Sequence, residues 1–116
     1  MSLLFNKSTP ESYAVSLGFP VLLNLWLDYL EDCESKFQKI ETLLKEEDWN
    51  NLRILFHSLK SSSLIFGLDK FSELCTKIER NILQIDISDN CISEIKSVKN
   101  LWLESIHEAM SYFQPK

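Results

Sequence analysis

The organising stretch of this chain covers residues 48–80 and reads DWNNLRILFHSLKSSSLIFGLDKFSELCTKIER. On a helical wheel at about 100° per residue, six apolar residues and one serine in its first half share roughly one third of the circumference, the stripe expected of a core-facing helix. They are Trp49, Leu52, Leu55, Phe56, Leu59, Ser63 and Phe66. This pattern predicts a helix over residues 48–66, with Asp48 as its N-cap and a left-handed Gly67 at its end.

His57 lies well off the apolar stripe, so we expect its imidazole to face water. Positions three and four apart are neighbours on a helix surface, which places Arg53, Lys60 and Ser61 within one turn of it. A neutral imidazole is a nucleophile that needs no prior loss of a proton. Nearby cations would stabilise an anionic product by charge-assisted hydrogen bonds. The pattern therefore indicates a phosphoryl carrier, with His57 as acceptor and Lys60, Arg53 and Ser61 around the phosphate.

Three further helices of comparable pattern are expected. Residues 20–46 carry a heptad seam, in which apolar residues are spaced alternately three and four apart. Residues 68–83 and residues 89–113 each carry an apolar stripe at helical spacing. The seam consists of Leu23, Trp26, Leu30, Cys33, Phe37, Ile40 and Leu44; the later stripes consist of Phe71, Leu74, Cys75, Ile78 and Ile82, then Ile92, Ile95, Val98, Trp102, Ile106, Ala109 and Phe113. Packed together, these helices form an antiparallel four-helix bundle.

A short extra helix is expected before the bundle, over residues 10–17. Thr9 can cap it, Pro10 suits its first position, and Gly18 can end it. We expect it to lay Tyr13, Val15 or Leu17 over one end of the bundle.

Composition favours a single all-α domain spanning residues 1–116. The chain is 45% hydrophobic, enough for one modest core, and its 2 glycines and 3 prolines leave few helix breaks. The net charge of −5 argues against nucleic acid as a partner, because binding to the phosphate backbone needs an excess of Lys and Arg. An intramolecular bundle favours a monomer.

Other sites and locations are disfavoured by the sequence. The 3 cysteines form no C-x-x-C pair, and the two histidines, His57 and His107, are too far apart in the sequence to suggest a shared metal site, so no metal is expected. No apolar run approaches the roughly 18 residues that span a bilayer, and the N-terminus lacks the pattern of a signal peptide. We therefore expect a cytoplasmic protein without membrane contact.

Three hydrophobic residues lie on the His57 side of the same wheel, where a purely structural helix would carry polar side chains. They are Ile54, Leu64 and Ile65. Exposed hydrophobes beside an exposed nucleophile indicate a docking patch for a partner protein, to which we also assign Gly67. The alternative is that a neighbouring helix covers some of them.

The residues around His57 resemble the signature of the histidine phosphotransfer (HPt) domain family, which reads roughly H-x-L-K-G-S-[SA]-x(3)-G-x(3)-L-x(3)-C-x(2)-[LI]-E. The matches run over 23 residues at fixed spacing: His57, Leu59, Lys60, Ser62, Gly67, Cys75, Ile78 and Glu79. Ser61 departs from the usual glycine, although it is still small, and Phe71 replaces a leucine within the core.

The resemblance implies that His57 accepts a phosphoryl group from the aspartate of one receiver domain and passes it to another. The implied partners are response-regulator receiver domains and a hybrid sensor histidine kinase. The receiver supplies Mg²⁺, so no cofactor is expected on this chain. Because the sequence has no Gly-rich phosphate loop, it should not use ATP directly.

Other classes of protein remain open. A degenerate HPt-like module would bind receivers or kinases without carrying phosphate. The histidine-bearing region of a sensor kinase also presents a helical histidine, but its H-E-x-R/L-P pattern differs from the sequence at His57. A carboxylate-bridged metal enzyme needs paired Glu-x-x-His sets, and Glu104 and His107 supply only one.

Overall fold

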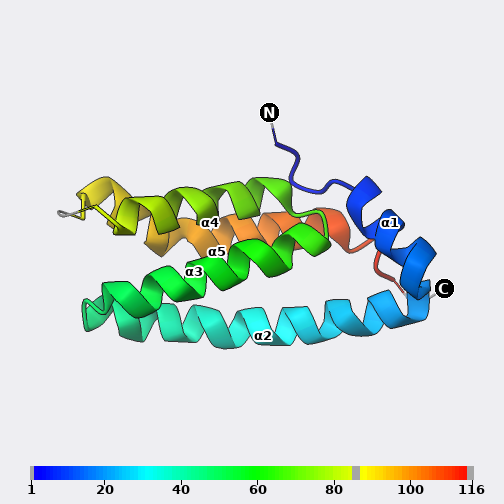
Figure 1. Cartoon of the computed structure of the whole chain (residues 1–116), viewed down its shortest axis with the longest axis horizontal. Helices are drawn as coiled ribbons and strands as arrows, with labels where there is room; N and C mark the ends of the chain where they lie inside the picture. The colour runs from blue at the N-terminus through cyan, green and yellow to red at the C-terminus, as the bar shows by residue number, and fades with distance from the viewer. Residues whose placement is uncertain (1, 85–86, 115–116) are drawn as a thin grey trace.

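The computed structural model describes residues 2–84 and 87–114, and within these it is all-helical. Its helices are α1 (Ser8–Leu17), α2 (Phe19–Lys45), α3 (Trp49–Ile65), α4 (Asp69–Ile82) and α5 (Asp89–Ala109). The helices from α2 to α5 run alternately up and down the long axis as a four-helix bundle, and α1 lies at the end where α2 begins (Figure 1). The fold class predicted from the sequence is confirmed.

The core of α2 is only partly described by the predicted heptad seam. Trp26, Cys33, Phe37 and Ile40 are buried, but so are Leu22 and Tyr29, which lie outside the seam. The predicted positions Leu23, Leu30 and Leu44 are only half-buried. A straight helix of 3.6 residues per turn drifts away from a strict seven-residue repeat, and a helix in a globular core buries a wider stripe than a coiled-coil seam.

A buried hydrogen-bonded cluster links three helices. The Trp102 Nε1–H of α5 donates to the Tyr29 hydroxyl of α2 (3.1 Å), which lies 2.6 Å from the Ser63 Oγ of α3. Burial raises the pKa of the Tyr29 hydroxyl well above its ordinary value. Polar atoms in a core cost free energy when unpaired, so this cluster favours one arrangement of the three helices.

The ends of α3 follow the sequence prediction. The Asp48 carboxylate accepts the Asn51 N–H at 3.3 Å, which caps the first turn. Gly67 follows the helix with a φ of +76°, in the left-handed region that favours glycine. The Gly67 carbonyl accepts the Asn6 N–H at 2.7 Å, so the N-terminal segment is bonded to the turn between α3 and α4.

The first helix differs from its prediction. It begins at Ser8, because the Asn6 side-chain oxygen accepts the Ser8 N–H (3.3 Å) and starts the turn earlier than a Thr9 cap would. Pro10 is the residue that α1 buries. The predicted contacts of Tyr13, Val15 and Leu17 are wrong, since all three are substantially exposed.

The last helix is shorter than predicted. It ends at Ala109, whose carbonyl accepts the N–H groups of Tyr112 and Phe113 in a following turn. Phe113 is still buried, because this turn brings its ring onto Trp26 of α2, with centroids 4.2 Å apart and the planes nearly parallel. The apolar residue at position 113 therefore reflects packing of the C-terminal turn rather than helix.

Candidate functional site

His57 lies on the exposed surface of α3 and is hydrogen-bonded to Glu79 of α4. The His57 side chain is 60% exposed, and its Nδ1 lies 2.8 Å and 3.1 Å from the two Glu79 carboxylate oxygens. The Glu79 side chain is only 15% exposed, so this carboxylate is shielded on the side away from the imidazole.

The contact with Glu79 selects one tautomer of the imidazole. An ionised carboxylate can only accept hydrogen bonds, so the nitrogen beside it must carry the proton. Nδ1–H therefore donates to Glu79, and in a neutral ring the lone pair is on Nε2. No described residue bonds Nε2, which leaves this nitrogen available to an electrophile.

Lys60 is the second residue that shares the Glu79 carboxylate. Its Nζ lies 3.6 Å from Glu79 Oε1, and its side chain is 24% exposed. The carboxylate thus holds an imidazole and an ammonium group on one small area of surface between α3 and α4. A cation held loosely in this way can move to a new anion at the histidine with little rearrangement.

Packing between α3 and α4 fixes this juxtaposition. Phe56 and Leu59 flank His57 in the sequence and are fully buried, and Cys75 and Ile78 of α4 are fully buried as well. At the next turn the hydroxyl of Ser72 donates to the Lys60 carbonyl at 3.2 Å. Because these contacts set the register of the two helices, Glu79 lies opposite His57.

Arg53 and Ser61, the other predicted phosphate-stabilising residues, are not bonded to the imidazole. The Arg53 guanidinium donates to Asn50 Oδ1 at 3.4 Å, and it forms no ion pair with a described residue. The Ser61 hydroxyl donates to the His57 backbone carbonyl at 3.1 Å. Both residues lie within one turn of His57, but the contact with Glu79 distinguishes Lys60 from them.

The predicted docking residues are exposed, with one exception. Ile54 is 51%, Leu64 46% and Ile65 36% exposed. The sequence also predicts a docking role for Gly67, but the structure buries it against Asn6. Gly67 therefore has no surface to offer a partner, and its role is to end α3. We use the name docking patch for Ile54, Leu64 and Ile65.

Glu79 has no role in the sequence prediction, although it belongs to the matched motif. Its distance of 22 residues from His57 carries no periodic signal, because the contact depends on how α3 packs against α4. The signal available was its place as the acidic residue at the end of that motif, directly after Ile78.

The described residues offer neither a metal-binding cluster nor a membrane-spanning helix. Among residues 2–84 and 87–114, no group of three or more His, Cys, Asp or Glu side chains is placed to hold a metal ion. Within the same residues, no helix is both long enough and apolar enough to cross a bilayer.

Comparison with protein families identifies the family to which the chain belongs. The model of the Hpt domain family matches residues 24–109, well over half of the chain. The matched region contains His57, Lys60 and Glu79 and leaves α1 outside. Searches of curated proteins and of solved structures returned no match.

Proposed function

Because the chain belongs to the Hpt domain family, whose members are phosphocarrier modules of phosphorelays, we propose that His57 carries the phosphoryl group in this protein. In this proposal His57 accepts the group from the phosphorylated aspartate of one receiver domain and passes it to the aspartate of another. The single observation that supports it most is the Glu79 contact, which leaves Nε2 of an exposed histidine as the nucleophile.

The transfer step follows from this geometry. The Nε2 lone pair attacks phosphorus, the N–P bond forms, and the bond from phosphorus to the aspartyl oxygen breaks. The electron pair leaves with the aspartate as a carboxylate. The proton on Nδ1 stays in place, so the phosphorylated ring carries a positive charge that the Glu79 carboxylate stabilises. Return transfer to a second receiver reverses these steps.

Lys60 is the best placed cation for the phosphoryl oxygens. Its Nζ is already within 3.6 Å of Glu79, and the new anion at Nε2 would compete for it. Arg53 and the Ser61 hydroxyl lie one turn away on either side and can add weaker contacts after rotation. In this proposal the receiver supplies Mg²⁺ and the acidic pocket, and the chain itself does not use ATP.

The docking patch gives a second part of the proposal. Ile54 lies before His57 on α3, Leu64 and Ile65 lie after it, and all three expose apolar surface that a receiver would cover. Leu64→Asp should weaken receiver association about tenfold while the bundle stays folded, because Leu64 is 46% exposed and does not belong to the buried core cluster. The measurement is receiver titration by calorimetry together with thermal unfolding; wild-type affinity in the variant would rule out the patch.

The alternative is a degenerate module that binds receivers without carrying phosphate. The bonded arrangement of His57, Lys60 and Glu79 favours the carrier, since a module used only for docking has no need of it.

Transfer from phosphorylated receiver domains to wild-type protein and to His57→Gln separates the two functions. We expect acid-labile, base-stable label on the wild type and none on the variant. Binding without label would support the docking module, and equal label on both proteins would contradict the assignment of His57.

A further inference from the structure

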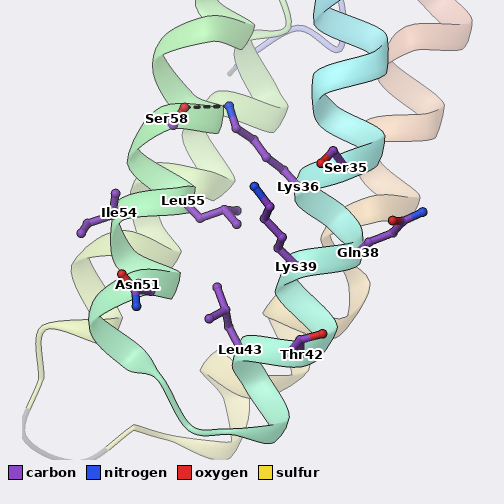
Figure 2. Close-up of a pocket in the computed structure, with 10 residues that line it drawn as sticks. All are labelled: Ser35, Lys36, Gln38, Lys39, Thr42, Leu43, Asn51, Ile54, Leu55 and Ser58. Carbon is purple, nitrogen blue, oxygen red and sulfur yellow. Dashed lines mark hydrogen bonds between the residues drawn. The ribbon is translucent and has the colours of Figure 1, made fainter.

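A cavity of about 640 Å³ opens between α2 and α3, next to the His57 surface. Its α3 wall includes Ile54 of the docking patch, Leu55 and Ser58, the residue that follows His57. Its α2 wall includes Leu43, Lys36 and Lys39 (Figure 2). We call this feature the α2–α3 groove. It is continuous with the docking patch because Ile54 belongs to both.

The two lysines of the groove differ in their partners. Lys36 Nζ lies 2.6 Å from Asp32 Oδ2 and donates to Ser58 Oγ at 2.7 Å, so its charge is balanced within the structure. Lys39 has neither an ion pair nor a hydrogen bond with any residue of the described ranges. Figure 2 shows the Lys39 side chain extending from α2 into the groove, toward α3.

An unpaired cation between apolar walls indicates the chemistry of the occupant. The complementary group is a carboxylate flanked by an aliphatic side chain, with the carboxylate at Lys39 and the aliphatic group against Leu43 and Ile54. The positive charge of Lys39 is a local feature, because the chain as a whole is negative, with a net charge of −5. An acidic partner would be repelled by most of this protein and attracted at this groove.

We propose that the α2–α3 groove is a specificity site for the receiver, in which Lys39 pairs with an acidic residue at the edge of the receiver's surface. This proposal rests on the proposed function, because it takes the occupant to be the domain that reaches His57. Lys39 then selects among receivers without contact with the phosphoryl group. The two lysines thus have separate roles, since Lys36 joins α2 to α3 and Lys39 meets the partner.

The test is a charge reversal with a matched control. Lys39→Glu and Lys45→Glu both lie on α2 and both change the net charge from −5 to −7, so the two variants are matched in net charge. Lys45 is exposed at the end of α2 and does not line the groove. Purified receiver domains of the source organism serve as probes, and the one that exchanges phosphate fastest with the wild type is used for kinetics.

We expect Lys39→Glu to lower the association rate constant about tenfold at low ionic strength, and Lys45→Glu to lower it less than twofold. The difference should shrink as salt is added, because screening weakens a pair at the rim of an interface. The rate of phosphate transfer within the saturated complex should not change. Equal effects of the two reversals would overturn the proposal.

Failure of the proposed function has a different signature. If no receiver transfers phosphate to His57 but one binds, the same comparison of Lys39→Glu and Lys45→Glu in binding still decides the role of the groove. If no receiver binds at all, both proposals are wrong. Sedimentation equilibrium gives a further check, since a loss of self-association in Lys39→Glu alone would identify a second copy of the chain as the occupant and overturn the receiver assignment.

Discussion

At the scale of single residues, the Glu79 carboxylate determines which nitrogen of His57 is available. It accepts the Nδ1–H at 2.8 Å, and Lys60 approaches the same carboxylate at 3.6 Å. The carboxylate therefore holds the ring in one tautomer, and in the proposed transfer it would stabilise the charged ring that forms. In the proposed transfer Glu79 is a positioning residue, because it contacts His57 Nδ1 and not the nitrogen that would receive the phosphoryl group.

Replacement of Glu79 separates its charge from its hydrogen bond. Glu79→Gln retains a side-chain oxygen for Nδ1–H but loses the negative charge, a difference of about 1 kcal/mol between a charged and a neutral hydrogen bond. We expect transfer from a saturating receiver to slow about fivefold in Glu79→Gln and more in Glu79→Ala. The control is Glu104→Gln, an exposed residue on α5. Wild-type rates in both Glu79 variants would contradict this role.

Residue types near His57 were predictable because they lie within one helical turn of it. Lys60, Arg53 and Ser61 follow from spacing alone. Which of them contacts Glu79 does not, because that carboxylate lies on another helix and pairs with Lys60, whereas the side chains of Arg53 and Ser61 bond to Asn50 and to backbone.

At the scale of the helices, the turn between α3 and α4 depends on Gly67. A Cβ at this position would lie 2.2 Å from the Asn6 carbonyl oxygen, in addition to the strain of a positive φ. Gly18 has a φ of +86°, but a Cβ at this position would lie 3.9 Å from its nearest neighbour, Pro20 Cδ. Both glycines therefore have a positive φ, and they differ in the steric contact that a Cβ would make.

This difference predicts unequal losses of stability. Gly18→Ala should lower the free energy of unfolding by about 1–2 kcal/mol, because a φ of +86° with a ψ of 143° is a backbone conformation that alanine avoids. Gly67→Ala should lower it by about 3 kcal/mol, because backbone rather than a flexible side chain must move. Urea unfolding at one temperature measures both. Equal losses would show that the Asn6 contact does not constrain the turn.

The sequence predicted helix ends correctly where the signal lies within the helix itself. The prediction was wrong where the end depends on a contact with another segment. Asp48 and Gly67 act on their own helix, so their residue types are sufficient. The start of α1 depends on the Asn6 side chain, and Phe113 packs on Trp26 through a turn. Neither contact leaves a periodic pattern in the sequence.

At the scale of the whole molecule, the three cysteines report on the integrity of the core. Cys33, Cys75 and Cys91 are fully buried on three different helices. Burial raises the pKa of the Cys33 thiol from 9.0 to about 12 and raises the pKa of the other two thiols as well. A thiol reacts as the thiolate, so both burial and protonation suppress its reaction.

Alkylation by iodoacetamide should therefore be slow in the folded protein and should accelerate little between about pH 8 and 10, where thiols of the unfolded chain ionise. The raised pKa of Cys33 favours the protonated thiol in the folded state. Its contribution to stability is thus complete below about pH 9 and is lost as the pH rises toward 12. Rapid labelling of native protein at pH 8 would contradict the packed core; protein in urea is the control.

The bundle itself was predictable from four amphipathic segments, but the surface features that join two helices were not. The pairing of His57 with Glu79 and the α2–α3 groove each depend on side chains from two helices, 22 residues apart in the first case. Spacing within one helix places residues on a face, whereas only the packing of one helix on another decides which faces meet.

The most direct test of the account is nitrogen NMR of the protein, with ¹⁵N in its histidine rings, before and after phosphorylation by a receiver. Before transfer, we predict the Nδ1–H tautomer of His57. After transfer, we predict coupling of phosphorus to His57 Nε2, with Nδ1 still protonated and bonded to Glu79. Phosphorus on Nδ1, on His107, or on neither histidine would contradict the proposal that Glu79 leaves His57 Nε2 as the phosphoryl acceptor.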